Sequence, residues 1–125
     1  MKRIYTFGHE QVERNITVAD MISNKNNNIK MTQVTAGNQE EAEIIASQDI
    51  DMIITGSDWY QDVRKGAPNT FITAALFAGR FITNEEILRG AFDVMMAGAD
   101  SVLTPRSYDV VEMLAKEGMQ VQGHV

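Results

Sequence analysis

Four polar side chains follow runs of apolar residues, at positions where they could bind a small acidic ligand. Ser57 and Asp58 come directly after one such run, Arg106 after a second and His124 after a third. An arginine pairs with a carboxylate through its planar fork, and a histidine can donate or accept a hydrogen bond. If the runs are parallel strands, their carboxyl ends lie at one edge of a sheet, where ligands bind in α/β proteins.

Each of these residues also has a purely structural interpretation. Ser57 and Asp58 could form a polar turn that caps a short helix. Arg106 could pair with nearby acids at the surface. His124 is next to the end of the chain, where a solvated side chain is common. Both interpretations remain open for all four.

The elements that would position these residues are clearest in the segment 65–102. The mainly apolar run Thr70–Phe77 is short enough for a buried parallel strand. Thr83–Glu86 is a capping box, which predicts a helix that begins at about Asn84 and ends at Gly98. Ser101–Thr104 is the next predicted strand, so the segment forms one strand, helix and strand unit.

The rest of the chain repeats this alternation. The sequence predicts three more strands, at Ile29–Thr35, Asp51–Thr55 and Met119–Gln122. Helices are expected from Thr17 to about Ser23, from an Asn38 cap, at 59–65, and from a Ser107 cap to Gly118. Residues 1–16 fit no clear pattern, although Arg3–Phe7 could be a short strand. Residues 1–125 therefore form one α/β domain in which 17–125 are βα units.

Two architectures fit five parallel strands. A closed (βα)8 barrel usually has about 250 residues, so five units would be a partial barrel. A flavodoxin-like open doubly wound sheet fits the length of 125 residues without remainder. Length alone favours the open sheet.

Composition excludes several classes of protein. There are no cysteines, hence no disulfide framework and no thiolate metal site. Eleven basic against seventeen acidic residues give a net charge of −6, and the basic residues are scattered, which argues against nucleic acid as a partner. No apolar run approaches the length of a membrane span. We expect a soluble, cytoplasmic protein.

Five pieces of sequence, in order, carry a resemblance to a known family. They are Val34-Thr35-Ala36, Ile53-Ile54-Thr55-Gly56-Ser57-Asp58, Arg64-Lys65-Gly66-Ala67-Pro68-Asn69, Met96-Ala97-Gly98-Ala99-Asp100 and Val121-Gln122-Gly123-His124-Val125. Over about residues 17–125 the chain resembles the ketopantoate hydroxymethyltransferases (3-methyl-2-oxobutanoate hydroxymethyltransferases) of the phosphoenolpyruvate/pyruvate TIM-barrel superfamily. The resemblance implies a barrel of which the first five strands are present, with its site at the strand carboxyl ends.

The resemblance also implies a site chemistry. In the family a divalent metal, usually magnesium, is held by acidic residues after the second, third and fourth strands. Here Asp58 is the candidate metal ligand, whereas Ala75 and the Pro105 region stand at the other two positions. Ser57, Arg106 and His124 would bind the substrate, and methylenetetrahydrofolate would be the cosubstrate if the family activity is retained. The family's catalytic base would lie beyond Val125, and no catalytic residue is assigned.

Two hypotheses for the function follow. In the first, the chain is a ketopantoate-hydroxymethyltransferase-like enzyme, reduced or part of a longer protein. It acts on a small 2-keto acid by enolate-stabilised carbon–carbon bond formation or cleavage. In the second, it is a non-catalytic α/β module that works through self-association or a partner. An open half-barrel would expose sheet edges and apolar faces, so we expect a homo-oligomer.

Overall fold

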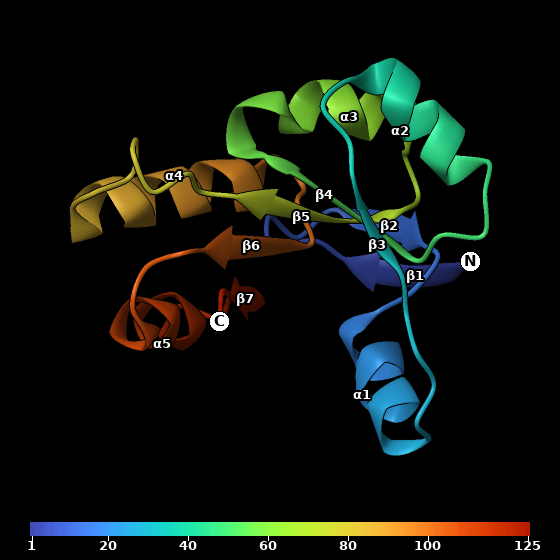
Figure 1. Ribbon diagram of the computed structural model, residues 1–125, viewed down its shortest axis with the longest axis horizontal. Helices are drawn as coiled ribbons and strands as arrows, with labels where there is room; N and C mark the ends of the chain where they lie inside the picture. Colours follow the sequence, from blue (N-terminus) through green and yellow to red (C-terminus); the bar gives the residue numbers. More distant parts are fainter.

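Five parallel strands, taken in the order of the sequence, form the centre of the structure (Figure 1). The computed structural model describes residues 1–125. Its elements are β1 (Lys2–Tyr5), β2 (Gln11–Arg14), α1 (Val18–Asn26), β3 (Gln33–Thr35), α2 (Gln39–Ala46), β4 (Met52–Gly56), η1 (Ser57–Trp59), α3 (Tyr60–Gly66), β5 (Phe71–Ala75), α4 (Asn84–Met96), β6 (Ser101–Thr104), α5 (Tyr108–Lys116) and β7 (Val121–Gly123). The predicted α/β class with five parallel strands is confirmed.

The order of the strands distinguishes the ways in which such a sheet can be wound. Neighbouring strands follow one another as β3-β4-β5-β6-β7, and every neighbouring pair is parallel. A doubly wound sheet reverses its strand order at a switch point, whereas a (βα)8 barrel adds each strand beside the last. This sheet has no reversal and does not close, so it has the winding of barrel units with open edges at β3 and β7.

The sheet is strongly curved. On a flat sheet the two edge strands, four steps apart, would be separated by about 19 Å. In the structure the side-chain amides of Gln33 on β3 and Gln122 on β7 hydrogen-bond each other reciprocally, at 3.3 Å. Both side chains lie on the inner, concave face, because the register places Gln33 beside Met52 and Gln122 beside Leu103.

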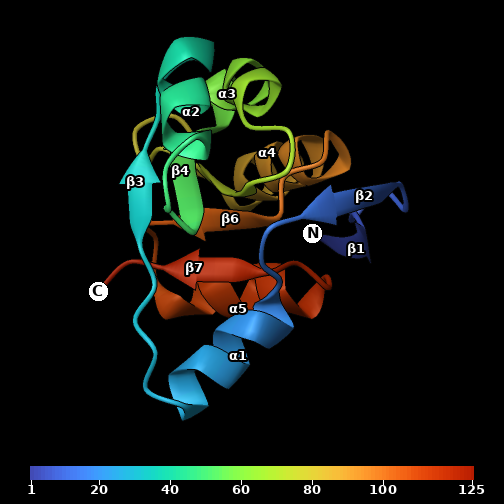
Figure 2. The same ribbon diagram turned by 90° about the vertical axis from the view of Figure 1, so that its right-hand side faces the viewer.

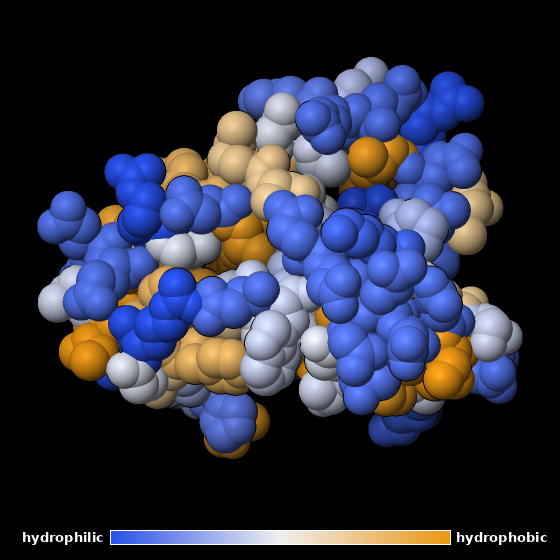
Figure 3. All heavy atoms as spheres, turned by 90° about the horizontal axis from the view of Figure 1, so that it is seen from above, coloured by the Kyte–Doolittle hydropathy of each residue, from blue (hydrophilic) through white to orange (hydrophobic).

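Helices α2 to α5 cover the outer face of this sheet (Figures 1 and 2). The core lies between them: Ile53, Ile72 and Val102 on the strands are fully buried among apolar helix residues. Each helix is thus held by an amphipathic face. Seen from above, the outer surface is mostly hydrophilic, with apolar groups in separate patches (Figure 3).

The predicted helix starts are largely confirmed. Thr17 with Asp20, and Thr83 with Glu86, form complete capping boxes, and the Asn38 side chain accepts from the N–H of Glu41. The predicted cap at Ser107 is wrong in one respect. Ser107 is the N-cap residue of α5, but its side chain makes no capping hydrogen bond.

Several element boundaries differ from prediction. The strand expected over Ile29–Thr35 contains only Gln33–Thr35, because only these residues pair with β4. Helix α1 continues to Asn26 instead of ending near Ser23, and Asn28 takes the left-handed turn at φ 56°. An asparagine-rich stretch can form either a last helical turn or a loop, so composition did not fix this end.

The first sixteen residues contain a strand close to the one suggested at Arg3–Phe7, but its pairing with a second strand was not predicted. Strands β1 and β2 pair as an antiparallel hairpin, with Ile4 opposite Val12. The turn between them is irregular, with His9 at φ 66°, and it lacks the Asn-Gly or Gly-Gly signal of a short hairpin. The alternation of apolar and polar residues that marks a strand is also weak in this segment, because most side chains of β1 and β2 face solvent.

Helix α1 stands apart from α2 to α5, on the side of the sheet where the strands begin (Figure 1). Val18 and Met21 on this helix line a cavity of about 380 Å³ together with inner-face residues of the sheet. These residues are Gln33, Met52, Phe71, Thr73, Ser101 and Gln122. The helix therefore closes one end of the half-barrel.

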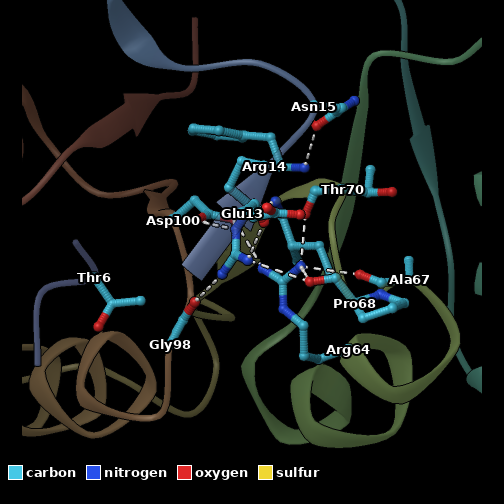
Figure 4. A network of polar contacts seen from close by, with 12 residues as sticks. Thr6, Glu13, Arg14, Asn15, Arg64, Ala67, Pro68, Thr70, Gly98 and Asp100 are labelled. Atoms are coloured by element: carbon cyan, nitrogen blue, oxygen red, sulfur yellow. Dashed lines mark hydrogen bonds and ion pairs between the residues drawn. The ribbon is translucent and has the colours of Figure 1, made fainter. Parts of the chain in front are cut away.

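A buried carboxylate joins the hairpin to the sheet (Figure 4). Asp100, 2% exposed, accepts from Arg14 Nε at 2.7 and 2.9 Å, from Arg64 Nη2 at 2.8 Å and from the Ile72 N–H at 2.9 Å. Remaining N–H groups of the two arginines donate to backbone carbonyls, including Gly98 and Thr70. Every side-chain nitrogen of the two arginines makes at least one hydrogen bond, as burial of such charges requires.

The next residue after the hairpin extends this attachment. The Asn15 side chain donates to the carbonyl of Asp51 at 2.7 Å and accepts from the N–H of Phe71 at 2.9 Å. It thus joins the starts of β4 and β5. The amino-terminal end of the sheet is held by polar contacts with residues that precede it in sequence.

The phenol of Tyr60 belongs to the same region. Its oxygen accepts from Arg64 Nε at 2.9 Å, and the side chain is 1% exposed. Burial raises the pKa of Tyr60 above its ordinary value, and the charge of Arg64 offsets part of this effect. The folded protein therefore favours the neutral phenol.

We predict that Asp100→Ala lowers the free energy of unfolding by about 3–5 kcal/mol, because it leaves two buried arginines without their anion. Urea unfolding followed by circular dichroism measures this change. The control is Glu112→Ala, which removes an exposed ion pair with Lys116 and should cost less than about 1 kcal/mol. Equal losses in the two variants would contradict the structural role of Asp100.

Tyr60 also predicts a pH dependence of stability. Its folded pKa is raised, so its contribution is complete below the unfolded pKa of about 10 and is lost as the pH rises through the folded value. The free energy of unfolding should therefore fall above about pH 10, and Tyr60→Phe should remove part of that fall. The exposed Tyr108 provides the control, since Tyr108→Phe should leave the alkaline profile of the wild type intact.

Candidate functional site at the strand carboxyl ends

The inner face of the sheet ends in a row of four neighbouring residues. The register aligns Gly56 of β4 with Ala75 of β5, Leu103 of β6 and Gln122 of β7. Three of these carry no polar side-chain atom, and the fourth is an amide. The mouth of the half-barrel is therefore lined mainly by apolar groups and backbone.

Ser57 and Asp58 face a different space from this row. Both lie on the η1 turn after β4 and line a hollow of about 190 Å³ between α3 and α4. The Ser57 hydroxyl is buried there without a hydrogen-bond partner. Asp58 forms an ion pair with Arg80, which lines the same hollow. The structure thus brings the two predicted residues together, on the helix side of the strand end.

Arg106 and His124 lie at the ends of the two following strands. Arg106 is half-buried, and its backbone N–H donates to Thr104 Oγ1 at 3.2 Å. His124 directly follows β7 and is exposed. Because β6 and β7 are neighbours, both residues stand at the same edge of the sheet. Neither lines the hollow that contains Ser57 and Asp58.

Two aromatic side chains also occupy this edge. Trp59 and Phe77, 48% and 44% exposed, meet edge to face with ring centroids 5.7 Å apart. The Phe77 ring lies over Gly56 so closely that a Cβ on the glycine would come within 2.6 Å of it. The end of β4 is therefore covered by an aromatic ring.

Sequence reasoning missed Arg80, Trp59 and Phe77 as parts of this region. Phe77 was predicted as the last residue of a strand, but β5 ends at Ala75, which frees the side chain to fold back. Gly56 was the available signal, because a glycine at a strand end often marks a close approach by another group. No spacing in the sequence pairs Arg80 with Asp58.

The side chains present do not fit the metal site that the resemblance implies. Magnesium takes oxygen ligands in octahedral geometry, and Ala75 and Leu103 on the third and fourth strands of the sheet offer none. Asp58 has Arg80 as its counter-ion. No group of three or more histidine, aspartate or glutamate side chains is placed to hold a metal ion. Of the three ligand positions that the resemblance implies, only that of Asp58 carries an acidic side chain.

The geometry therefore offers two sets of polar groups at one edge. The hollow between α3 and α4 has a hydroxyl, a carboxylate and a guanidinium; the ends of β6 and β7 have a guanidinium, an imidazole and the Gln122 amide. Such donors can bind a carboxylate or a keto oxygen. None of them is adjacent to a nucleophile and base pair of the kind used in covalent catalysis.

No helix of the chain is both long enough and apolar enough to cross a membrane. No family model matches the chain. A curated relative, 3-methyl-2-oxobutanoate hydroxymethyltransferase of Deinococcus radiodurans, is 41% identical over 69 residues. The match covers 50% of this chain and 24% of the relative, so the chain spans about a quarter of that protein's length. These findings support a partial relationship between this chain and the hydroxymethyltransferases.

Proposed function

We propose that this chain supplies five (βα) units of a hydroxymethyltransferase-like barrel and binds a small 2-keto acid at the strand carboxyl ends. The observation that carries the proposal is the winding of the sheet. Its strands run in sequence order and curve until Gln33 and Gln122 meet across the concave face, as in barrel units. The partial identity to 3-methyl-2-oxobutanoate hydroxymethyltransferase supports the same reading.

The ligand class follows from the donors. A 2-keto acid carries a carboxylate next to a carbonyl, so it can accept two hydrogen bonds from a guanidinium and one from an imidazole or amide. Arg106 and His124 are the groups that we assign to this role. The Ser57 hydroxyl faces the hollow between α3 and α4 and is not part of this set. Fixed donors of this kind also stabilise the enolate that forms when a carbon–carbon bond is made or broken beside the carbonyl.

The proposal is limited to binding and enolate stabilisation. Transfer of a hydroxymethyl group from methylenetetrahydrofolate is what the resemblance implies, and it requires a base that removes a proton from the keto acid. No residue of this chain is assigned that role.

We predict that Arg106→Ala weakens binding of 3-methyl-2-oxobutanoate at least about tenfold, because a hydrogen bond to a charged group contributes about 1.5–3 kcal/mol. His124→Ala should act in the same direction. Isothermal titration calorimetry on the wild type and variants measures the dissociation constants. Arg89 on α4 is exposed and distant in sequence from the strand ends, so Arg89→Ala is the charge-matched control. Unchanged affinity in Arg106→Ala would remove this residue from the site.

A second candidate function is non-catalytic assembly of the chain with copies of itself. The observation that favours it is that the sheet has unpaired edges and a partly exposed inner face. Both edge strands, β3 and β7, lack a partner on one side, and the inner-face residues Ile54, Ala75 and Leu103 are only half-buried. Natural proteins pair or cover such edges and faces. We propose a homo-oligomer in which the concave face or the edges are covered.

Light scattering over a range of protein concentrations tests this candidate. We predict an assembly larger than 13.9 kDa that Ile54→Lys disrupts. The lysine charge would have to be buried when the concave face is covered in the assembly, and this opposes association. Ile44 is exposed on the outside of α2, so Ile44→Lys provides a matched control that should leave the assembly intact. A monomer at all concentrations would contradict self-association.

A further inference from the structure

We infer that the strand-end site of this chain works without a divalent metal ion, and that Arg80 takes the place of the metal as counter-ion of Asp58. This inference deepens the proposed function and rests on it for the identity of the ligand. It concerns a property in which the chain departs from the family that it resembles. Three features of the strand ends support it.

The first feature is the set of side chains on the concave face. Gly56, Ala75 and Leu103 are register neighbours at the ends of β4, β5 and β6. A metal site for a keto acid needs carboxylate or other oxygen ligands from the protein, and magnesium usually takes one or two carboxylates there. The side chains of Gly56, Ala75 and Leu103 contain no oxygen atom and so supply no metal ligand. The nearest polar side chain in the row, Gln122, is already hydrogen-bonded to Gln33.

The second feature is the state of Asp58. Its carboxylate is paired with the guanidinium of Arg80, and both side chains are about half exposed. A metal ion would have to displace a cation that is already in contact. The pair also lies in the hollow between α3 and α4, on the helix side of the strand end, and not on the concave face. Asp58 is therefore neutralised and turned away from the row of strand ends.

The third feature is the space above β4. The Phe77 ring would lie only 2.6 Å from a Cβ on Gly56, and the ring packs edge-on against Trp59. Hydrated magnesium keeps several water molecules, and these need room and polar partners. An aromatic ring in this place takes up that room and provides no ligand. The end of the strand that carries Asp58 is thus apolar where a metal would meet the keto acid.

A guanidinium and a metal ion bring different chemistry to such a site. A guanidinium is a permanent planar cation that donates several hydrogen bonds in fixed directions, whereas magnesium accepts lone pairs from oxygen atoms arranged as an octahedron. A site in which Arg106 binds the ligand therefore selects the carboxylate of a keto acid. The affinity of this site for the keto acid does not depend on the concentration of free metal ions. The chain would bind its ligand equally well in the presence of a chelator.

Titration of the full chain with Mn²⁺, followed by the electron paramagnetic resonance signal of the free ion, tests the inference directly. We expect binding weaker than about 1 mM, the weak end of protein cation sites, in both the wild type and Asp58→Asn. The inference is overturned by saturable binding of one ion per chain that Asp58→Asn abolishes. Asp109→Asn, an exposed acid on α5, is the control for loss of charge and should retain any binding seen in the wild type.

A second measurement separates this inference from the proposed function. The dissociation constant of 3-methyl-2-oxobutanoate should be the same with EDTA as with excess magnesium. Tighter binding with magnesium, lost in Asp58→Asn, would overturn the metal-free site while supporting the keto-acid function. If the keto acid binds under neither condition, the proposed function fails, and the Mn²⁺ titration still decides whether the strand ends hold a metal.

Discussion

The fold depends on one buried carboxylate. Asp100 stands before β6 and accepts hydrogen bonds from the hairpin through Arg14, from α3 through Arg64 and from β5 through its backbone. The hairpin, α3, β5 and the start of β6 are thus fixed to one another at the amino-terminal end of the sheet. In barrel proteins this end serves stability, and the opposite end carries chemistry. The charges used here for stability are separate from those of the candidate site.

Curvature of the sheet determines what can lie at that site. Because β3 and β7 bend towards each other, the row from Gly56 to Gln122 faces a confined concave space, and helices α2 to α5 are on the outside. The turn after β4 departs from this arrangement. It carries Ser57 and Asp58 outwards to α3 and α4, where Arg80 meets the acid. Ser57 and Asp58 therefore follow a strand directly in the sequence, but in the structure they lie at the interface between two helices.

The parts of the fold that could be predicted from sequence are those with local causes. The capping boxes at Thr17 and Thr83 fix helix starts through contacts three residues apart, and both are found as expected. The hairpin was missed because Arg14 is held by Asp100, 86 residues away, and no local pattern reports such a contact. The pairing of Asp58 with Arg80 and the position of Phe77 over Gly56 are likewise set by tertiary packing. Residue types indicated a polar strand edge, but not which face each side chain takes.

The long separation between Arg14 and Asp100 has a consequence for the order of folding. The hairpin precedes the five-stranded sheet in the sequence, and its anchoring anion follows 86 residues later. Loop closure over such a distance is entropically unfavourable until intervening elements have formed. We therefore expect the β3 to β5 units to assemble first and the hairpin to dock onto a sheet that already exists. Residues that come early in the sequence would then be among the last to reach their native positions.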